Sequence, residues 1–241
     1  MQRIKKVEKS LSSQMKKRVS AKASPVEEYD GDFDHIIHTG STLLDLNISG
    51  DRIHGGGIPS GILVEIFGPS GSGKTVLLSE IAGAIQRLGG DIKFSDPEAR
   101  LNPQFAKLFG LELQEGSYSQ PDTVTEVFKA VREWKPSNKG DVHGVFADSL
   151  AALSTDMEME AKEGDKMGMR RAKEFSEELR KTCRILAQNN YLMVCSNQVR
   201  VNVDGGQFSP KYTTPGGEAI GFYSSLRLQA KTSSKLWQEE S

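Results

Sequence analysis

Short, mostly apolar runs alternate along this chain with longer segments that carry helix signals. The apolar runs are typical of buried β-strands, and they occupy residues 62–67, 92–95, 142–148, 191–198 and 224–229. The segments between them have the apolar spacing or the start and stop residues of helices, and they occupy residues 76–85, 103–109, 123–134 and 165–189. Strands that alternate with helices predict an α/β fold, with a mostly parallel sheet flanked by helices.

Local signals mark the ends of these predicted elements. Thr123 and Glu126 have the spacing of a capping box and predict the start of a helix. Gly89 and Gly90 predict the C-terminal end of the helix that begins near Val76. Residues 200–217 are rich in glycine and predict a loop before the last strand.

The turn before the first of these helices carries the clearest chemical motif. Residues 68–75 fit the phosphate-binding P-loop pattern, with a strand before and a helix after. Backbone N–H groups around such a turn converge on one point, which suits the β- and γ-phosphates of a nucleotide. Lys74 would add a positive charge on those phosphates, and Thr75 a hydroxyl ligand for Mg²⁺. The candidate nucleotide-binding residues here are Gly68, Pro69, Ser70, Gly71, Ser72, Gly73, Lys74, Thr75 and Val76.

A chance match in a glycine-rich turn is the alternative, because the chain has 24 glycines. The complete pattern in its expected context favours binding of a nucleoside triphosphate. The predicted cofactors are therefore ATP and Mg²⁺.

Polar side chains end or follow several of the predicted strands. In parallel sheets, ligands bind at the carboxyl ends of the strands, where the P-loop, Glu98, Asp148 and Gln198 would meet. One pocket is therefore expected to hold residues from four strands.

Each of these residues has a candidate chemical role and an alternative explanation without a role at the site. Asp148 would hold Mg²⁺ beside Thr75, or it caps a following helix. Glu98 would orient and partly deprotonate the attacking water, or it is a surface residue in a turn. Gln198 would sense the γ-phosphate and pass that state to the next loop, or it satisfies local backbone groups. The predicted catalytic residues are Glu98, Lys74 and Gln198.

The loop after Gln198 combines flexible backbone with cations and aromatic rings. Arg200, Phe208, Lys211 and Tyr212 lie within it. This combination suits single-stranded DNA, which is bound by stacking and phosphate contacts. A loop without a ligand is the alternative.

Charge is distributed unevenly along the chain. Residues 1–22 hold eight lysines or arginines and one glutamate, a charge of +7, which leaves −8 for the rest because the whole chain carries −1. Apolar residues recur there every three or four positions and predict a short basic amphipathic helix. Three interpretations are open: a solvated tail, a helix that packs on another subunit, or a contact with nucleic acid or an anionic surface.

Composition narrows the class of protein. The 241 residues suffice for one large α/β domain with a small extension. No apolar run is long enough for a membrane span, and the N-terminus has no apolar signal-peptide core, so we expect a cytoplasmic protein without a membrane partner. The two cysteines, Cys183 and Cys195, lack metal-ligand spacing and are expected to be buried free thiols.

Several motifs together resemble the core of the RecA/RadA recombinases. The resemblance runs from about Ile36 to Gln229, and its motifs occur in RecA order and at close to RecA spacing. They include the P-loop, Asp-Pro-Glu-Ala-Arg-Leu-Asn-Pro at 96–103, Gly-Asp-Lys-Met-Gly at 164–168, Asn-Gln-Val-Arg at 197–200 and Thr-Thr-Pro-Gly-Gly at 213–217.

The resemblance implies an ATPase that assembles on DNA as a helical filament. It implies roles for Lys74 and Thr75 on phosphate and Mg²⁺, Glu98 on water, Asp148 as the Walker B acid and Gln198 as the γ-phosphate sensor. It also implies that Phe105 and Asn102 contribute to nucleotide binding, with Phe105 against adenine. The residues that it implies for DNA binding are Met167, Arg170, Arg171, Arg200, Phe208, Lys211 and Tyr212.

The resemblance also implies a domain organisation. Residues 1–35 would form the basic helix and linker by which one subunit docks on its neighbour, and residues 36–241 the ATPase core, without the C-terminal domain of RecA. The chain is then either a fragment or a core-only relative, and no residues match the lysines that reach a neighbour's ATP in RecA.

We therefore expect an ATP-dependent recombinase that binds single-stranded DNA, and duplex DNA during pairing, in homologous recombination or repair. Two alternatives remain at this point: a weakly hydrolysing RecA paralogue that serves as an accessory factor, and a hexameric helicase-type motor.

Overall fold

The computed structural model describes residues 35–138, 140, 142–156, 168–201, 212–216 and 218–232. The chain divides into two compact units, Met1–Gly31 and Asp32–Ser241. The first unit, with the predicted basic helix, lies outside the described residues.

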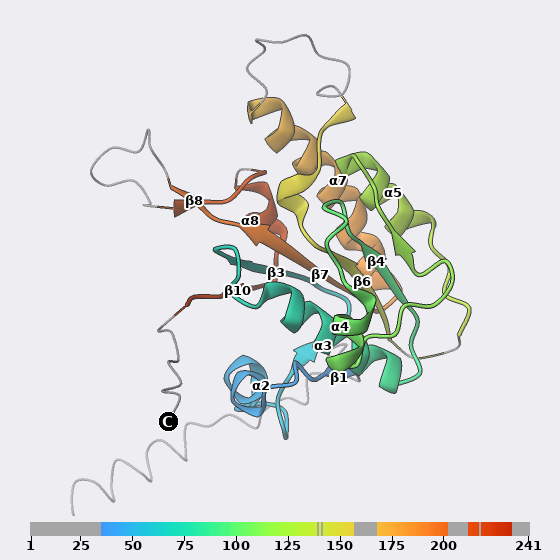
Figure 1. Cartoon of the computed structure of the whole chain (residues 1–241). Helices are drawn as coiled ribbons and strands as arrows, with labels where there is room; N and C mark the ends of the chain where they lie inside the picture. The colour runs from blue at the N-terminus through green and yellow to red at the C-terminus, as the bar shows by residue number, and fades with distance from the viewer. Residues whose placement is uncertain are drawn as a thin grey trace, which may run out of the picture. The chain divides into compact units, whose positions relative to one another are not determined.

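A six-stranded sheet forms the centre of the second unit (Figure 1). Its strand order is β10-β3-β7-β6-β4-β5, and every neighbouring pair is parallel. In that order the strands are Leu226–Gln229, Leu63–Gly68, Tyr191–Gln198, His143–Ala147, Ile92–Ser95 and Tyr118–Ser119. The predicted α/β fold with a mostly parallel sheet is confirmed. Sequence analysis missed the two-residue edge strand β5.

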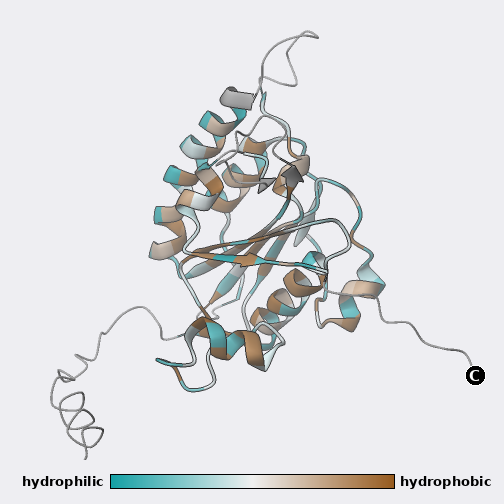
Figure 2. Ribbon diagram, turned by 90° about the vertical axis from the view of Figure 1, so that its left-hand side faces the viewer, coloured by the Kyte–Doolittle hydropathy of each residue, from teal (hydrophilic) through white to brown (hydrophobic). Residues whose placement is uncertain are grey.

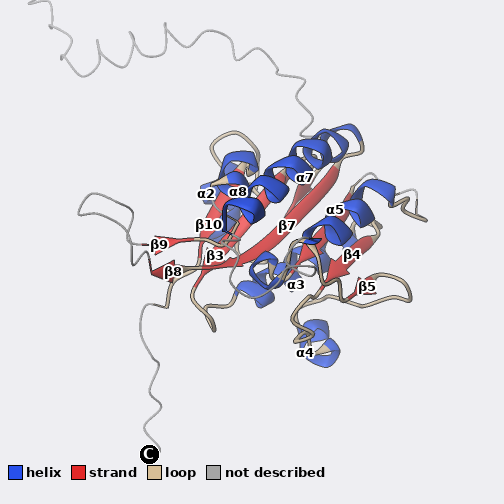
Figure 3. Ribbon diagram, turned by 90° about the horizontal axis from the view of Figure 1, so that it is seen from above, coloured by secondary structure: helices blue, strands red, loops and turns tan. Residues whose placement is uncertain are grey.

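Helices flank this sheet on both faces (Figure 3). They are α2 (Thr42–Ser49), α3 (Lys74–Arg87), α4 (Pro103–Leu108), α5 (Val124–Glu133), α7 (Gly168–Gln188) and α8 (Ala219–Tyr223), with a short 3₁₀ turn η1 (Leu150–Ala152) after β6. The predicted capping box at the start of α5 is present, with Thr123 and Glu126 each bonded to the other's backbone N–H. Helix α3 ends next to Gly89, whose φ of +82° suits glycine at the end of a helix. Sequence analysis missed α2 and α8.

The central strands are apolar on both faces because each face packs against helices. On β7, Leu192 and Val194 belong to the core that contains α3, whereas Met193 and Cys195 belong to the core that contains α5 and α7. Figure 2 shows the strands between helices that carry both hydrophobic and hydrophilic residues. This packing holds the carboxyl ends of the strands in fixed positions.

Both cysteines are free, as expected. Cys195 is buried in β7 and Cys183 is half-buried on α7. Burial raises the pKa of both thiols. Neither thiol is therefore activated as a nucleophile.

Two small antiparallel pairs lie outside the main sheet. Strand β1 (Ile36–Ile37) pairs with β2 (Ile58–Pro59). Strand β8 (Arg200–Val201) pairs with β9 (Tyr212–Thr213). The second pair corrects the prediction that residues 200–217 form only a loop, because backbone pairing joins the two ends of that stretch. Among the described residues, no helix is both long and apolar enough to cross a membrane.

Candidate active site

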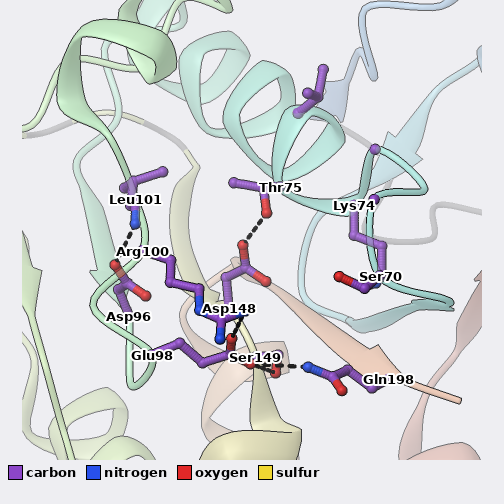
Figure 4. Close-up of a pocket in the computed structure, with 13 residues that line it drawn as sticks. Ser70, Lys74, Thr75, Asp96, Glu98, Arg100, Leu101, Asp148, Ser149 and Gln198 are labelled. Carbon is purple, nitrogen blue, oxygen red and sulfur yellow. Dashed lines mark hydrogen bonds and ion pairs between the residues drawn. The ribbon is translucent and has the colours of Figure 1, made fainter. Parts of the chain in front are cut away.

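A cavity of about 370 Å³ lies where the carboxyl ends of β3, β4, β6 and β7 meet (Figure 4). A volume of this size is typical of small-molecule sites. It is lined by Ser70, Gly71, Gly73, Lys74, Thr75, Val76, Asp96, Glu98, Arg100, Leu101, Asp148, Ser149 and Gln198. The expectation that the P-loop, Glu98, Asp148 and Gln198 share one pocket therefore matches the geometry.

The P-loop joins β3 to α3 and turns sharply at Gly73, which precedes the helix with a φ of +87°. Lys74 is buried, and its Nζ donates hydrogen bonds to the carbonyl oxygens of Gly68 and Pro69, at 3.0 and 2.7 Å. Burial lowers the pKa of Lys74, while the charges of Asp148 and Glu98 oppose that shift. These two bonds hold the ammonium group of Lys74 against the P-loop.

Two hydroxyl groups hold the carboxylate of Asp148, which follows β6. Thr75 Oγ1 donates to Asp148 Oδ2 at 2.5 Å, and Ser196 Oγ donates to Asp148 Oδ1. Hydroxyl and carboxylate oxygens are ligands that Mg²⁺ accepts. The pair from α3 and β6 is therefore a suitable place for this cation.

Glu98 lies across the cavity from the P-loop and contacts three polar side chains. Its Oε1 accepts hydrogen bonds from Ser149 Oγ at 3.0 Å and from Gln198 Nε2 at 3.1 Å. Its Oε2 forms an ion pair with Arg100 at 3.0 Å. Figure 4 shows these side chains pointing toward one another. These contacts with protein side chains orient the Glu98 carboxylate in the cavity.

A buried carboxylate organises the turn that carries Glu98. Asp96 is 2% exposed, and its Oδ2 accepts hydrogen bonds from the Leu101 amide at 2.8 Å and from Tyr118 Oη at 2.9 Å. The Ala99 amide donates to the Asp96 carbonyl at 3.1 Å. These bonds fix both ends of the turn that positions Glu98.

A second buried network includes Asn197, the residue before Gln198. Glu65, fully buried on β3, accepts hydrogen bonds from Arg227 Nε at 2.6 Å and from Asn197 Nδ2 at 2.9 Å. Asn197 Nδ2 also donates to the Pro215 carbonyl at 3.1 Å. Asn197 therefore joins the strand that ends at Gln198 to the chain that follows β9.

Five of the predicted nucleotide-binding residues do not line the cavity. Gly68 and Pro69 present the carbonyls that hold Lys74, and Ser72 Oγ donates to the Pro69 carbonyl at 2.8 Å. Asn102 caps α4, accepting from the amides of Gln104 and Phe105. Phe105 is 45% exposed, and its ring packs edge-on against Phe109 with the centroids 4.9 Å apart.

The predicted DNA-binding residues are only partly described. Met167, Phe208 and Lys211 lie outside the described residues, and for Arg170, Arg200 and Tyr212 only the backbone is described. Arg171 Nη2 donates to the carbonyls of Leu150 and Ala151, at 3.3 and 2.9 Å. Arg171 thus ties the start of α7 to the turn after Asp148.

Sequence analysis missed several residues of the site. Ser196 lies two residues before Gln198, so strand alternation places both on the same face, and this period could have revealed it. The polar residues that were missed are Asp96, Arg100, Ser149 and Ser196, and the apolar residue is Leu101. Arg100, two residues after Glu98, is the cation among these missed residues.

The fold and the cavity define an α/β protein with a P-loop at the carboxyl ends of its parallel strands. The family model of the RecA N-terminal domain matches residues 4–241. The protein RecA of Thermus aquaticus is 40% identical over 198 residues, which cover 82% of this chain and 56% of that protein. RecA of Borrelia hermsii is 38% identical over 195 residues, 81% of this chain and 52% of that protein.

A third relative matches a comparable part of the chain. RecA of Treponema denticola is 36% identical over 206 residues, 85% of this chain and 48% of that protein. The chain belongs to the RecA family, and the resemblance seen in its motifs is confirmed. It spans about half the length of these relatives.

Proposed function

We propose that this chain is an ATP-hydrolysing recombinase that binds single-stranded DNA and acts in homologous recombination or repair. The observation that carries the proposal is the convergence of Lys74, Thr75, Asp148, Glu98 and Gln198 on one cavity. These residues come from the ends of four parallel strands, where such sheets bind their ligands. Membership of the RecA family supports the same conclusion.

The residues around the cavity suit hydrolysis of the terminal phosphoryl group of ATP. Lys74 and the P-loop amides would hold the phosphates, and Glu98 would take a proton from the attacking water. The water oxygen bonds to the γ-phosphorus while the bond from that phosphorus to the β,γ-bridging oxygen breaks. The products are ADP and inorganic phosphate, and Glu98 later returns its proton to solvent.

The donor set also fits Mg²⁺. Thr75 and Asp148 offer hard oxygen atoms, and among the residues that the structure describes no group of three His, Cys, Asp or Glu side chains could bind a metal by itself. Mg²⁺ commonly takes one or two protein oxygens and completes its shell with substrate phosphates and water. When bound, it would neutralise charge on the β- and γ-phosphates.

Gln198 would relate the nucleotide to DNA. It ends β7, and β8 begins two residues later, at Arg200. The proposed DNA-binding loop at 200–212 begins with β8 and ends at the start of β9. Residues 158–168 resemble a further DNA-binding loop of RecA, and α7 begins at Gly168. A change in the contacts of Gln198 would therefore act on the base of a DNA-binding loop.

The wider organisation is also a proposal. Residues 1–35 would dock on a neighbouring core in a homo-oligomeric filament, and residues 36–241 would form the ATPase core. DNA is the expected partner, and the bacterial relatives support a site of action in the cytoplasm of a bacterial or phage-infected cell.

The decisive test measures ATP hydrolysis with and without single-stranded DNA. We expect DNA to stimulate the wild-type chain at least several-fold and Lys74→Ala to abolish the activity. Lys129→Ala, which changes an exposed lysine on α5, is the matched control and should behave as the wild type.

Other outcomes would contradict the proposal. A flat, near-zero rate in a chain that binds ATP would point to the accessory paralogue. Unwinding of a forked duplex without strand pairing would point to a helicase-type motor.

A further inference from the structure

Arg100 is a cation inside the cavity to which no role has been given. Its guanidinium lies 3.0 Å from Glu98 Oε2, and its side chain is 75% exposed. Lys74 and Arg100 are the cations among the residues that line the cavity, opposite the carboxylates of Asp96, Glu98 and Asp148. A bound nucleoside triphosphate would add more negative charge to the cavity. The contacts that Lys74 and Arg100 make therefore determine how this charge is neutralised.

The two cations differ in freedom. Lys74 is buried, and two backbone carbonyls hold its Nζ. Arg100 is long and its side chain is exposed, whereas that of Glu98 is 18% exposed, so solvent screens and weakens the ion pair from the arginine side. The guanidinium can therefore leave Glu98 for a stronger partner, whereas Lys74 stays on the loop.

The backbone at Arg100 is nevertheless well fixed. The neighbouring Leu101 amide is bonded to the buried Asp96 carboxylate, and the Ala99 amide to the Asp96 carbonyl. Figure 4 shows the side chain of Arg100 running from this turn toward Glu98. The main chain of Arg100 is thus anchored, whereas its guanidinium can change partners. Such a side chain suits contact with a group whose position changes during a reaction.

Phosphate is a better partner for a guanidinium than a single carboxylate oxygen. Its oxygens match the planar fork of arginine and carry more charge. We propose that Arg100 is a catalytic residue that leaves Glu98 and donates hydrogen bonds to the γ-phosphoryl group of ATP. This inference rests on the proposed ATPase function and assigns the residue that recognises the terminal phosphate.

Two consequences follow for hydrolysis. The guanidinium stabilises the charge on the γ-phosphoryl oxygens as the bond to the β,γ-bridging oxygen breaks. The carboxylate of Glu98 loses its ion pair and becomes a stronger acceptor for the proton of the attacking water. Arg100 therefore acts only when the third phosphate is present, and ADP gives it no such partner.

The test compares ATP and ADP in variants of Arg100. Binding of each nucleotide with Mg²⁺ is measured by titration calorimetry in a Glu98→Gln background, which slows hydrolysis and removes the Glu98 charge. In that background, Arg100→Ala should weaken ATP binding about tenfold and change ADP binding less than about twofold. In the chain with Glu98 intact, Arg100→Ala should lower kcat about 100-fold, as the loss of one donor to a transition-state oxyanion does.

Control variants separate this effect from a structural one. Arg180→Ala changes an exposed arginine on α7, outside the cavity, and should leave binding and kcat unchanged. Arg100→Lys keeps the charge without the fork and should recover part of kcat. Arg100→Gln is the second neutral variant. Its nucleotide binding and kcat provide the test if Arg100→Ala lowers the thermal midpoint of unfolding.

The inference is overturned if the neutral variants weaken ATP and ADP equally, or leave both unchanged. It is also overturned if kcat stays the same or rises, because Arg100 would then only restrain Glu98. These results leave the proposed function standing as long as the wild-type chain hydrolyses ATP. A wild-type chain that binds no ATP would overturn both proposals.

Discussion

Gln198 Nε2 donates a hydrogen bond to Glu98 Oε1 at 3.1 Å, although 100 residues separate them in the chain. The amide belongs to the end of β7 and the carboxylate to the turn after β4. The proposed γ-phosphate sensor and the proposed general base are therefore in direct contact, and a movement of either changes the environment of the other.

Replacement of Gln198 by Ala should uncouple nucleotide binding from DNA binding. The change removes the amide but leaves the P-loop intact, so ATP affinity should stay within about threefold of the wild type. The gain in affinity for single-stranded DNA that ATP confers should be lost. Fluorescence anisotropy of a labelled oligonucleotide, with and without ATP, measures this gain.

Gln188→Ala is the matched control for that experiment, because it changes an exposed glutamine at the end of α7. It should retain the full ATP-dependent gain. If Gln198→Ala also retains it, the contact with Glu98 has no part in coupling.

Replacement of Glu98 by Gln should separate ATP binding from turnover. The variant keeps the size of the side chain and an oxygen that can accept from Ser149, but it cannot take a proton from water. We expect kcat to fall about 100-fold or more, with ATP affinity preserved. Release of phosphate under saturating ATP gives the rate, and an unchanged rate would remove Glu98 from the chemistry.

The ion pair between α5 and α7 should make stability depend on pH. Burial alone would raise the pKa of Glu178, but hydrogen bonds from Lys181 and Arg132, together with their charges, lower it overall below 4.5. A carboxyl group with a lowered pKa stabilises the fold above about pH 4.5, and that stabilisation is lost as the pH falls through the folded-state pKa.

The variant that tests this is Arg132→Met. Arg132 Nη1 lies 2.5 Å from Glu178 Oε2, and both side chains are largely buried. At pH 7 the variant should lose about 2 kcal/mol of unfolding free energy, because a buried carboxylate keeps Lys181 but loses its second cation. Urea unfolding should show this difference shrinking below pH 4.5.

Lys173→Met is the control on the same helix. Its partner Glu177 is 3.9 Å away, and this pair is exposed, so the change should cost less than about 0.5 kcal/mol at any pH. A difference between Arg132→Met and the wild type that stays constant from pH 7 down through the folded-state pKa of Glu178 would refute the assignment.

The buried charge of Glu65 gives a further prediction for stability. Arg227→Met leaves the carboxylate of Glu65 with Asn197 alone and should destabilise the fold by about 3 kcal/mol. The double variant Glu65→Met/Arg227→Met leaves no buried charge and should be the milder of the two. Chemical denaturation measures the loss of unfolding free energy in each variant. A larger loss in the double variant would show that the unpaired charge of Glu65 does not cause the destabilisation.

Much of this fold could be predicted because the relevant signals are local. Apolar runs bounded by turns marked β3, β4, β6 and β7 to within a residue or two. The carboxyl-end rule for parallel sheets then brought Glu98, Asp148 and Gln198 together without knowledge of strand order. The rule works because parallel strands end at one edge of the sheet, whatever their sequence.

Other parts depended on contacts that no local pattern shows. Strand β5 has two residues, and only its pairing with β4 defines it. Ser149 and Ser196 are common residues whose importance comes from the carboxylates of Glu98 and Asp148, which neighbouring strands and turns supply. No local signal in the sequence marked Arg100 as a site residue, and the turn fixed by Asp96 is what places it at the cavity.

The measurement that tests the central claim most directly is the binding of ATP with Mg²⁺ to the folded chain, by titration calorimetry. The account predicts one saturable site per chain, with an affinity at least about 100-fold lower in Lys74→Ala. A chain that is folded by circular dichroism and yet binds no ATP, or a Lys74→Ala variant that binds it as tightly as the wild type, would contradict it.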